Sequence, residues 1–137
     1  MKYYNLYAIF FCFLLIPKAV NAYTLKACID EDKREDRIEA AKWWATSSKA
    51  IEIFRNGNSL KLEALIQRPL IMGPSKNQLK TKNISQLFTA DAIVSIQEAE
   101  PICGYFNYMG NFIADGNIWF GLVDGEVKII SIPGAKR

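Results

Sequence analysis

Side chains that could carry out acid–base or nucleophilic chemistry are limited in kind, because the 137-residue chain contains no histidine. Histidine is the commonest general base and a usual zinc ligand, so such chemistry falls to carboxylates, tyrosines and cysteines. A buried acid beside a tyrosine could act as a base and an oxyanion donor. The acids instead lie in turns, as at Asp115 and Asp124, or in a solvated helix start over residues 31–39. We therefore expect no enzyme activity, no metal site and no cofactor.

Cysteine is the other reactive residue type. Of three cysteines, Cys12 lies inside an N-terminal apolar run, which leaves Cys28 and Cys103 as a pair. In an oxidising compartment this pair predicts one disulfide, which contributes on the order of 4 kcal/mol in the chain-entropy model because it closes a long loop. The alternatives are a free buried thiol pair and a redox-active pair, although the latter normally has CxxC spacing.

The first 22 residues have the layout of a secretory signal peptide. Lys2 lies near the start, an apolar run covers residues 7–16, and the segment ends in small residues at Ala22. The uninterrupted run is about ten residues, short of the roughly 20 needed to cross a membrane. We predict cleavage after Ala22 and a mature protein that is periplasmic or secreted.

Composition excludes several classes of partner. Half of the residues are hydrophobic, enough to order a single domain over residues 23–137. Removal of Lys2 and Lys18 with the signal lowers the net charge from +3 to +1. A nearly neutral chain without a basic stripe predicts no nucleic-acid partner. Without a second long apolar stretch, it also predicts no membrane association after cleavage.

The N-terminal half of the mature chain has helical periodicity. Residues 30–56 predict one long helix, which the Asn56-Gly57-Asn58 stop signal ends. Its apolar stripe is expected at Ile38, Ala41, Trp44 or Ala45, Ile51 and Phe54. A second helix is expected over residues 59–67 with Leu62, Leu65 and Ile66 inward, before Pro69.

The middle of the chain predicts a small hairpin and a third helix. Residues 70–72 and 79–82 are expected to form two short strands around a Gly-Pro turn. Asn83 or Ser85 is expected to cap a brief helix around residues 86–88 that continues to Gln97.

The C-terminal third predicts a three-stranded antiparallel meander. Aromatic and branched runs at residues 103–114, 117–123 and 127–132 are separated by Asp115-Gly116 and Asp124-Gly125, a strong hairpin signal. These runs are apolar on both faces, whereas a sheet with one solvated face alternates apolar and polar residues. We therefore expect helices on one face and a pocket or a partner on the other.

The aromatic side chains are the candidate binding residues. Adjacent tryptophans on a helix point about 100° apart, so we expect one in the core and one at a boundary, the alternative being a stacking platform. On the strands, large aromatics fit a ligand pocket or a protein interface, and the alternative is a sheet packed on both sides. The candidate set is Trp43, Trp44, Tyr105, Tyr108, Trp119 and Phe120.

Three stretches, LEALIQRPLIM, NISQLFTADAIVSI and MGNFIADGNIWFGLVDGEVKIISI, resemble small exported bacterial proteins of the NTF2-like family. Ala114 stands where that family usually has glycine, and Asn117 where it usually has an acid. The resemblance implies an α+β fold, the NTF2-like (cystatin-like) cone, with N-terminal helices packed on a curved antiparallel sheet. It transfers no catalytic residue.

These observations predict a non-catalytic binding protein. Export and an excess of apolar sheet surface favour a protein partner, as for an immunity protein or inhibitor of a toxin or hydrolase, and the same surface would suit a homodimer. One alternative is a carrier of a small apolar ligand in the cone, ringed by Tyr105, Tyr108 and Trp119. Another is an isomerase or hydrolase of the NTF2-like type.

Overall fold

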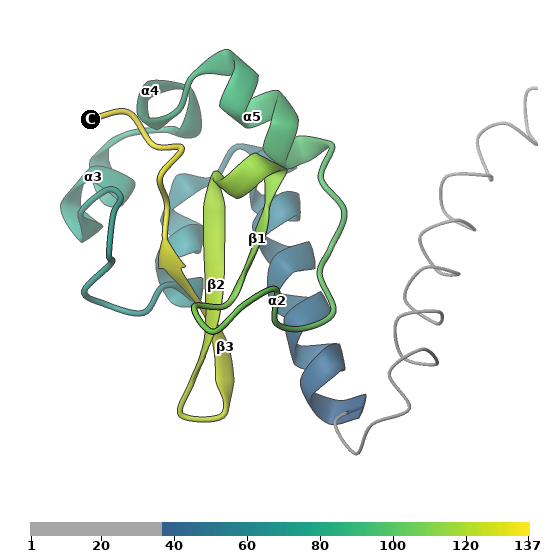
Figure 1. Ribbon diagram of the computed structural model, residues 1–137. Coiled ribbons are helices and arrows are strands. Elements are labelled where there is room, and N and C mark those ends of the chain that lie inside the picture. The colour runs from purple at the N-terminus through teal and green to yellow at the C-terminus, as the bar shows by residue number, and fades with distance from the viewer. Residues whose placement is uncertain (1–36) are drawn as a thin grey trace, which may run out of the picture. The chain divides into compact units, whose positions relative to one another are not determined.

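The computed structural model describes residues 37–137, and residues 38–137 cluster into one unit (Figure 1). The predicted signal peptide, Met1–Ala22, and Cys28 lie outside the described residues, as does the expected first part of the long helix. The elements in order are α2 (Arg37–Asn56), η1 (Ser59–Leu65), α3 (Lys76–Thr81), α4 (Ile84–Leu87), α5 (Ala90–Gln97), β1 (Asn111–Ile113), η2 (Ala114–Gly116), β2 (Ile118–Val123) and β3 (Glu126–Ser131).

Helix α2 ends at Asn56 as predicted, and Ile51 and Phe54 are buried as expected, but the first half of its buried stripe differs from the predicted one. Ile38 is 76% exposed, whereas Ala40, Trp43, Ser47 and Ala50 are buried. The prediction missed this register because a polar residue, Ser47, occupies the middle of the stripe. Its hydroxyl donates to the Trp43 carbonyl at 2.8 Å, which satisfies the serine inside the core.

The expected hairpin in the middle of the chain is wrong. Residues 76–81 form helix α3, because Ser75 and Gln78 make a reciprocal capping box at its start. Residues 70–72 do not pair with 79–82 but run beside β3, where the Ile71 amide donates to the Ile130 carbonyl at 2.9 Å. The preceding segment, η1, is a 3-10 helix in which Leu62 is buried.

The third predicted helix is divided in two. Asn83 caps α4 through its own capping box, and Thr89 then caps α5 by accepting from the Ala92 amide at 3.2 Å. Phe88 between them has extended backbone angles and is buried. The break brings the Phe88 ring against Phe54 of α2, with ring centroids 4.9 Å apart.

The predicted meander is confirmed, since β1, β2 and β3 form an antiparallel sheet in that order. The first strand is shorter than expected, because only residues 111–113 of the 103–114 run pair with β2. Gly110 lets the chain turn into β1: its φ is +131°, and a Cβ there would lie within van der Waals overlap of the Phe120 carbonyl oxygen. Residues 103–110 form a loop instead of a strand.

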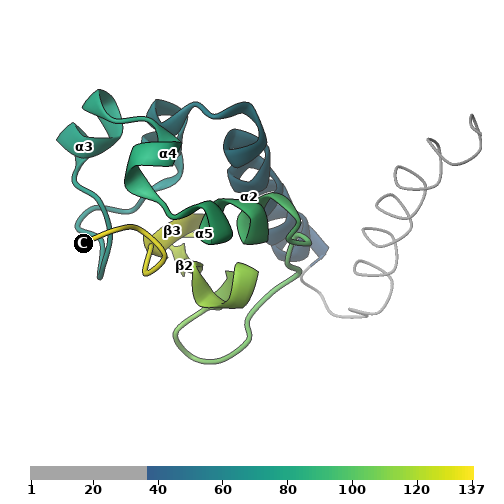
Figure 2. The same cartoon turned by 90° about the horizontal axis from the view of Figure 1, so that it is seen from above.

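The described unit is an α+β fold. Figure 2 shows α2 and α4 on one side of the strands and the loop before β1 on the other, and Figure 1 shows α5 beyond the ends of β1 and β2. The covered face carries Ile113, Ile118, Phe120 and Ile129, all buried. The opposite face of the sheet carries the candidate site.

Candidate binding surface

An aromatic row crosses the sheet face that the helices leave uncovered. Phe112 on β1 is paired with Trp119 on β2, and their ring centroids are 4.8 Å apart. Phe106 extends the row from the preceding loop, with its centroid 5.2 Å from that of Phe112 in an edge-on arrangement. Both strand residues are partly exposed, while their sequence neighbours Ile113 and Ile118 are buried on the other face. Strand alternation therefore places the row outward.

The loop of residues 103–110 presents further large side chains to solvent. Phe106 is 66% exposed, Tyr108 93% and Met109 47%. Backbone hydrogen bonds in both directions between Asn107 and Gly110, each 3.1 Å, close the turn that carries Tyr108 and Met109. The Asn107 carboxamide oxygen also accepts from the Met109 amide at 2.8 Å. These hydrogen bonds fix the backbone of the turn that carries the exposed Tyr108.

A small hollow lies next to this turn. It has a volume of about 180 Å³ and is lined by Ile71, Met109, Trp119, Ile130, Ser131 and Pro133. Gly121 accommodates Ile130 beside it, since a Cβ there would meet Ile130 side-chain atoms at 3.1 Å. Ser131 also lines the hollow, and its hydroxyl donates to the Met72 carbonyl at 3.5 Å.

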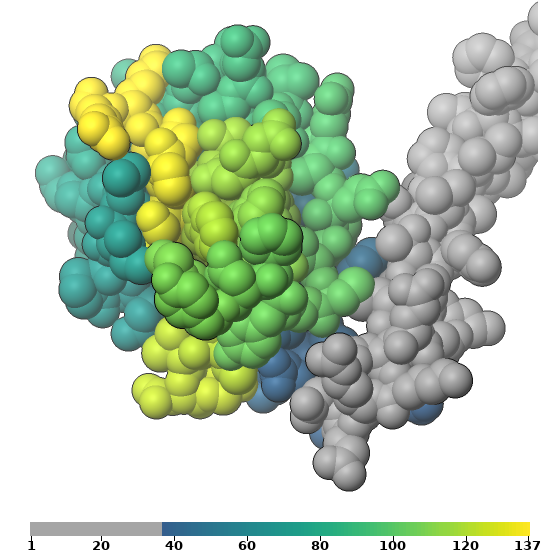
Figure 3. Space-filling model, in the orientation of Figure 1, coloured from purple at the N-terminus to yellow at the C-terminus, as the bar shows by residue number. Residues whose placement is uncertain are grey.

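Together these residues form one surface, here named the apolar face. Its members are Ile71, Met72, Phe106, Tyr108, Met109, Phe112, Trp119, Ile130 and Pro133. Figure 3 views the molecule from this side, with the loop before β1 lying over the strands. None of the nine residues is acidic or basic, and the guanidinium of Arg137 lies at one edge, 3.8 Å from the Met72 sulfur.

An ion pair holds one edge of the apolar face in place. Arg68 donates to the two carboxylate oxygens of Glu63 at 3.0 and 2.6 Å, and to the Pro74 carbonyl at 2.8 Å. The hydrogen bonds from Arg68 hold the pKa of Glu63 below its ordinary value. The pair therefore spans residues 63–74, the segment that presents Ile71.

The six predicted binding residues divide between this surface and the interior. Tyr108 and Trp119 belong to the apolar face, whereas Trp43 and Phe120 are fully buried in the core. Tyr105 is 53% exposed and stacks edge-on against Trp43, with centroids 5.0 Å apart. Trp44 is half-buried, so one tryptophan of the pair is in the core, as expected.

The sequence analysis did not identify two parts of the apolar face. Ile71 and Met72 lie far from the aromatic strands in sequence and belong to no regular element. Met109 lies within residues 103–114, which the sequence predicts as a strand. The Gly110 turn next to it is the one local signal that could have indicated a loop.

Cys103 is disulfide-bonded. The predicted partner, Cys28, lies outside the described residues, so the pairing of these two residues stays a prediction. Within residues 37–137, histidine, cysteine and acidic side chains form no group of three or more able to hold a metal ion. In the same part of the chain, no helix is long and apolar enough to cross a membrane.

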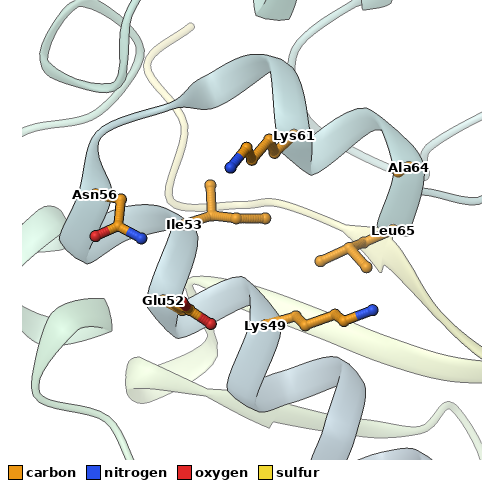
Figure 4. Close-up of a pocket in the computed structure, with 7 residues that line it drawn as sticks. All are labelled: Lys49, Glu52, Ile53, Asn56, Lys61, Ala64 and Leu65. Atoms are coloured by element: carbon orange, nitrogen blue, oxygen red, sulfur yellow. The ribbon is translucent and has the colours of Figure 1, made fainter.

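A second hollow lies on the helical side, between α2 and η1 (Figure 4). Its volume is about 330 Å³, and its apolar lining comes from Ile53, Ala64 and Leu65. The polar residues around it are Lys49, Glu52, Asn56 and Lys61. Two ammonium groups and one carboxylate give this groove a net positive charge.

The chain matches no family model, no curated protein and no solved structure.

Proposed function

We propose that this chain is a non-catalytic binding protein that docks a protein partner on the apolar face. The observation that carries the proposal is the gathering of Phe106, Tyr108, Met109 and Ile71 on the sheet side without helices. Aromatic and methionine side chains are enriched at protein interfaces, and charged ones are depleted at interface centres. The apolar face has that composition.

The accessible area of the apolar face lies at the upper end of the range for the largest apolar patch of a monomer. If a large apolar side chain has about 200 Å² of surface, the exposed fractions of Ile71, Met72, Phe106, Tyr108 and Met109 leave about 600 Å² accessible. The partly exposed Phe112, Trp119 and Ile130 add to this area. A typical monomer has a largest apolar patch of about 300–600 Å², and each side of a standard protein interface buries about 800 Å².

The class of partner follows from the predicted export. An immunity protein or inhibitor acts by covering a toxin or hydrolase, which needs a rigid apolar surface and no reactive groups. The closed turn at Asn107 and Gly110 orders the backbone that carries Tyr108, so less backbone entropy is lost on binding. The long helix α2 and the C-terminal meander support the NTF2-like cone as the finer description of the fold, whereas helix α3 in place of the expected hairpin departs from it.

Site-specific photo-crosslinking in the cells that make the protein tests this function. A benzophenone amino acid at position 108 is expected to give an adduct with a different protein, while the same group at exposed Val94 on α5 gives none. With that partner purified, Tyr108→Ala should weaken binding by about 30-fold, the loss typical of an interface hot spot, and Val94→Ala by less than about twofold. Equal adducts at both positions, or equal affinities of both variants, would refute the proposal.

The groove between α2 and η1 favours a second candidate function, carriage of a small ligand. Its volume of about 330 Å³ lies within the range of ligand pockets, and its apolar lining beneath two lysines fits an anionic amphiphile. Native mass spectrometry of the exported protein with dodecanoate as probe is expected to show a one-to-one complex that Lys49→Gln and Lys61→Gln together abolish. An unchanged complex in that double variant would exclude the groove.

A further inference from the structure

We propose that Met72 and Met109 are an oxidation site that controls docking on the apolar face. Hydrogen peroxide converts their thioethers to sulfoxides, and Arg137 holds the Met72 sulfoxide by donating a hydrogen bond to its oxygen. The oxidised surface is polar and no longer docks a protein. This inference rests on the proposed function, because it concerns the regulation of the same surface.

Both methionines of the predicted mature chain lie on the apolar face. The full chain has three methionines, and Met1 belongs to the predicted signal peptide. Methionine is commonly a core residue, yet the core formed by residues 37–137 contains none. Met72 is 39% exposed and Met109 47%. Met72 follows Ile71, which lines the same hollow as Met109, so the two thioethers are exposed on one surface.

Peroxide can reach both sulfur atoms, because methionine oxidation depends on exposure. Within residues 37–137 the one cysteine, Cys103, is disulfide-bonded, so no thiolate there competes for the oxidant. In the reaction a sulfur lone pair attacks one peroxide oxygen, and the S–O bond forms as the O–O bond breaks. The proton on the transferred oxygen passes to the departing hydroxide, which leaves as water. The sulfur loses two electrons, and the peroxide gains them.

The backbone at both positions is held in place. The Met72 carbonyl accepts from the Ile132 amide at 2.6 Å, just beyond β3. The Met109 amide donates to the Asn107 carboxamide oxygen at 2.8 Å. Neither methionine belongs to the core, where a sulfoxide would disrupt packing. We therefore expect oxidation to change the surface and to leave the fold intact.

A sulfoxide changes what the apolar face can bind. Met109 lines the hollow beside Trp119 and Ile130, where its thioether contributes an apolar contact. A partner that covered the face would bury the sulfoxide oxygen away from water, and burial of an unpaired polar group is unfavourable. Methionine sulfoxide reductases reverse the reaction, so the loss of docking is reversible.

Arg137 lies where it can bind the oxidised form of Met72. Its guanidinium Nη2 donates to the Met72 sulfur at 3.8 Å. A thioether sulfur is a weak acceptor, whereas the oxygen of a sulfoxide carries a partial negative charge and is a strong one. The rotatable bonds of methionine let the added oxygen turn toward the guanidinium. Oxidation therefore replaces an apolar edge of the surface by a polar pair.

Peroxide treatment of the exported, disulfide-intact protein is the first test. Mass mapping is expected to show one added oxygen at each of Met72 and Met109, at about half the rate measured in urea, in line with their exposed fractions. The melting temperature should stay within about 2 °C of the untreated protein. Protection of either residue by more than about tenfold, or unfolding of the oxidised protein, would overturn the inference.

Hydrophobic-interaction chromatography measures the change in the apolar face without a partner. The oxidised wild type is expected to elute earlier than the untreated protein. In the matched double variant Met72→Leu and Met109→Leu, which keeps side chains of similar volume, peroxide should leave the elution unchanged. An equal shift in this variant, or no shift in the wild type, would contradict the inference.

NMR of isotope-labelled methionine methyl groups tests the role of Arg137. In the oxidised protein, Arg137→Gln should move the Met72 methyl resonance and leave that of Met109 in place. Lys136→Gln, at the neighbouring exposed residue, is the matched control and should move neither resonance. A Met72 sulfoxide resonance that does not respond to Arg137→Gln would refute the hydrogen bond.

Photo-crosslinking in cells connects the oxidation to docking. With the benzophenone amino acid at position 108, peroxide should lower the yield of the adduct with another protein by at least about fivefold. The same treatment should leave the yield from the double leucine variant unchanged. An equal fall in both proteins would overturn the inference. If no such adduct forms even without peroxide, the proposed function fails, and the chromatographic shift still reports the oxidation site.

Discussion

At the scale of single residues, Ser47 shows how a polar side chain can determine the position of a core. Its hydroxyl is fully buried, donates to the Trp43 carbonyl at 2.8 Å and accepts from the Ile102 amide at 3.0 Å. It thereby joins α2 to the segment that leads into the loop of residues 103–110.

Replacing Ser47 should destabilise the protein without changing its fold. Ser47→Ala leaves the Ile102 amide without its acceptor, which costs about 1–3 kcal/mol of unfolding free energy. Urea denaturation followed by tryptophan fluorescence measures this. Ser48→Ala, at the half-buried neighbouring position, should cost less than about 0.5 kcal/mol. Equal losses for the two variants would contradict the role given to Ser47.

Gly110 is the other residue whose type has a clear structural reason. Gly110→Ala should destabilise by more than about 3 kcal/mol, because a Cβ would overlap the Phe120 carbonyl and φ is +131°. Gly104→Ala is the matched control, since nothing lies within 4 Å of its added Cβ. Thermal unfolding of the two variants measures the difference in stability. Similar melting temperatures would show that β1 does not need a glycine at position 110.

At the scale of elements, the capping residues determined whether a short apolar run formed a helix or a strand, which the hydrophobic pattern alone does not distinguish. Residues 76–81 form a helix because the side chains of Ser75 and Gln78 each accept a hydrogen bond from the other's backbone amide. Residues 70–72 therefore hydrogen-bond to the chain of β3 instead of to residues 79–82. The cap at Thr89 likewise separates α4 from α5. Short runs of four to eight apolar residues fit either a strand or a helix, so their flanking residues carry the information.

The Glu63–Arg68 pair links η1 to the segment bearing Ile71, and its contribution should depend on pH. The pKa of Glu63 is lowered from 4.5 chiefly by the hydrogen bonds from Arg68. The stabilisation is therefore complete above about pH 4.5 and is lost as the pH falls through the lower, folded-state pKa.

Urea titrations of Glu63→Gln across this pH range provide the measurement. The difference in unfolding free energy from wild type should be largest at neutral pH and should shrink below about pH 4.5. Glu100→Gln, at an exposed carboxylate with no hydrogen bond from the described residues, serves as the control. A difference for Glu63→Gln that stays constant down to pH 3 would contradict the assignment.

At the scale of the whole molecule, the disulfide of Cys103 is the covalent feature whose partner is still a prediction. Cys103 is disulfide-bonded, and the predicted export together with the cysteine count predicts Cys28 as its partner. A non-reducing peptide map of the exported protein should contain one peptide that links Cys28 to Cys103. Reduction, or Cys28→Ser, should lower the unfolding free energy by about 4 kcal/mol. A free thiol at Cys28 in the exported protein would disprove the pairing.

The fold could be predicted in outline and the binding surface only in part. The long helix, its end at Asn56 and the three-stranded order were readable because periodicity and Asp-Gly turns are local signals. Tyr108 and Trp119 were identified as candidates from their residue type. Trp43 and Phe120 were placed in the same set, although packing buries both.

The sequence by itself determined the end of α2 and the turns of the meander, since each depends on residues close together in the chain. Tertiary structure decided which aromatics face solvent and which neighbours they have. Ile71 reaches Trp119 and Ile130 only because residues 66–72 run beside β3. Burial depends on contacts between segments that are distant in the chain. Forming those contacts costs chain entropy, and only the packing of several segments together offsets that cost, so a short stretch of sequence does not reveal which residues are buried.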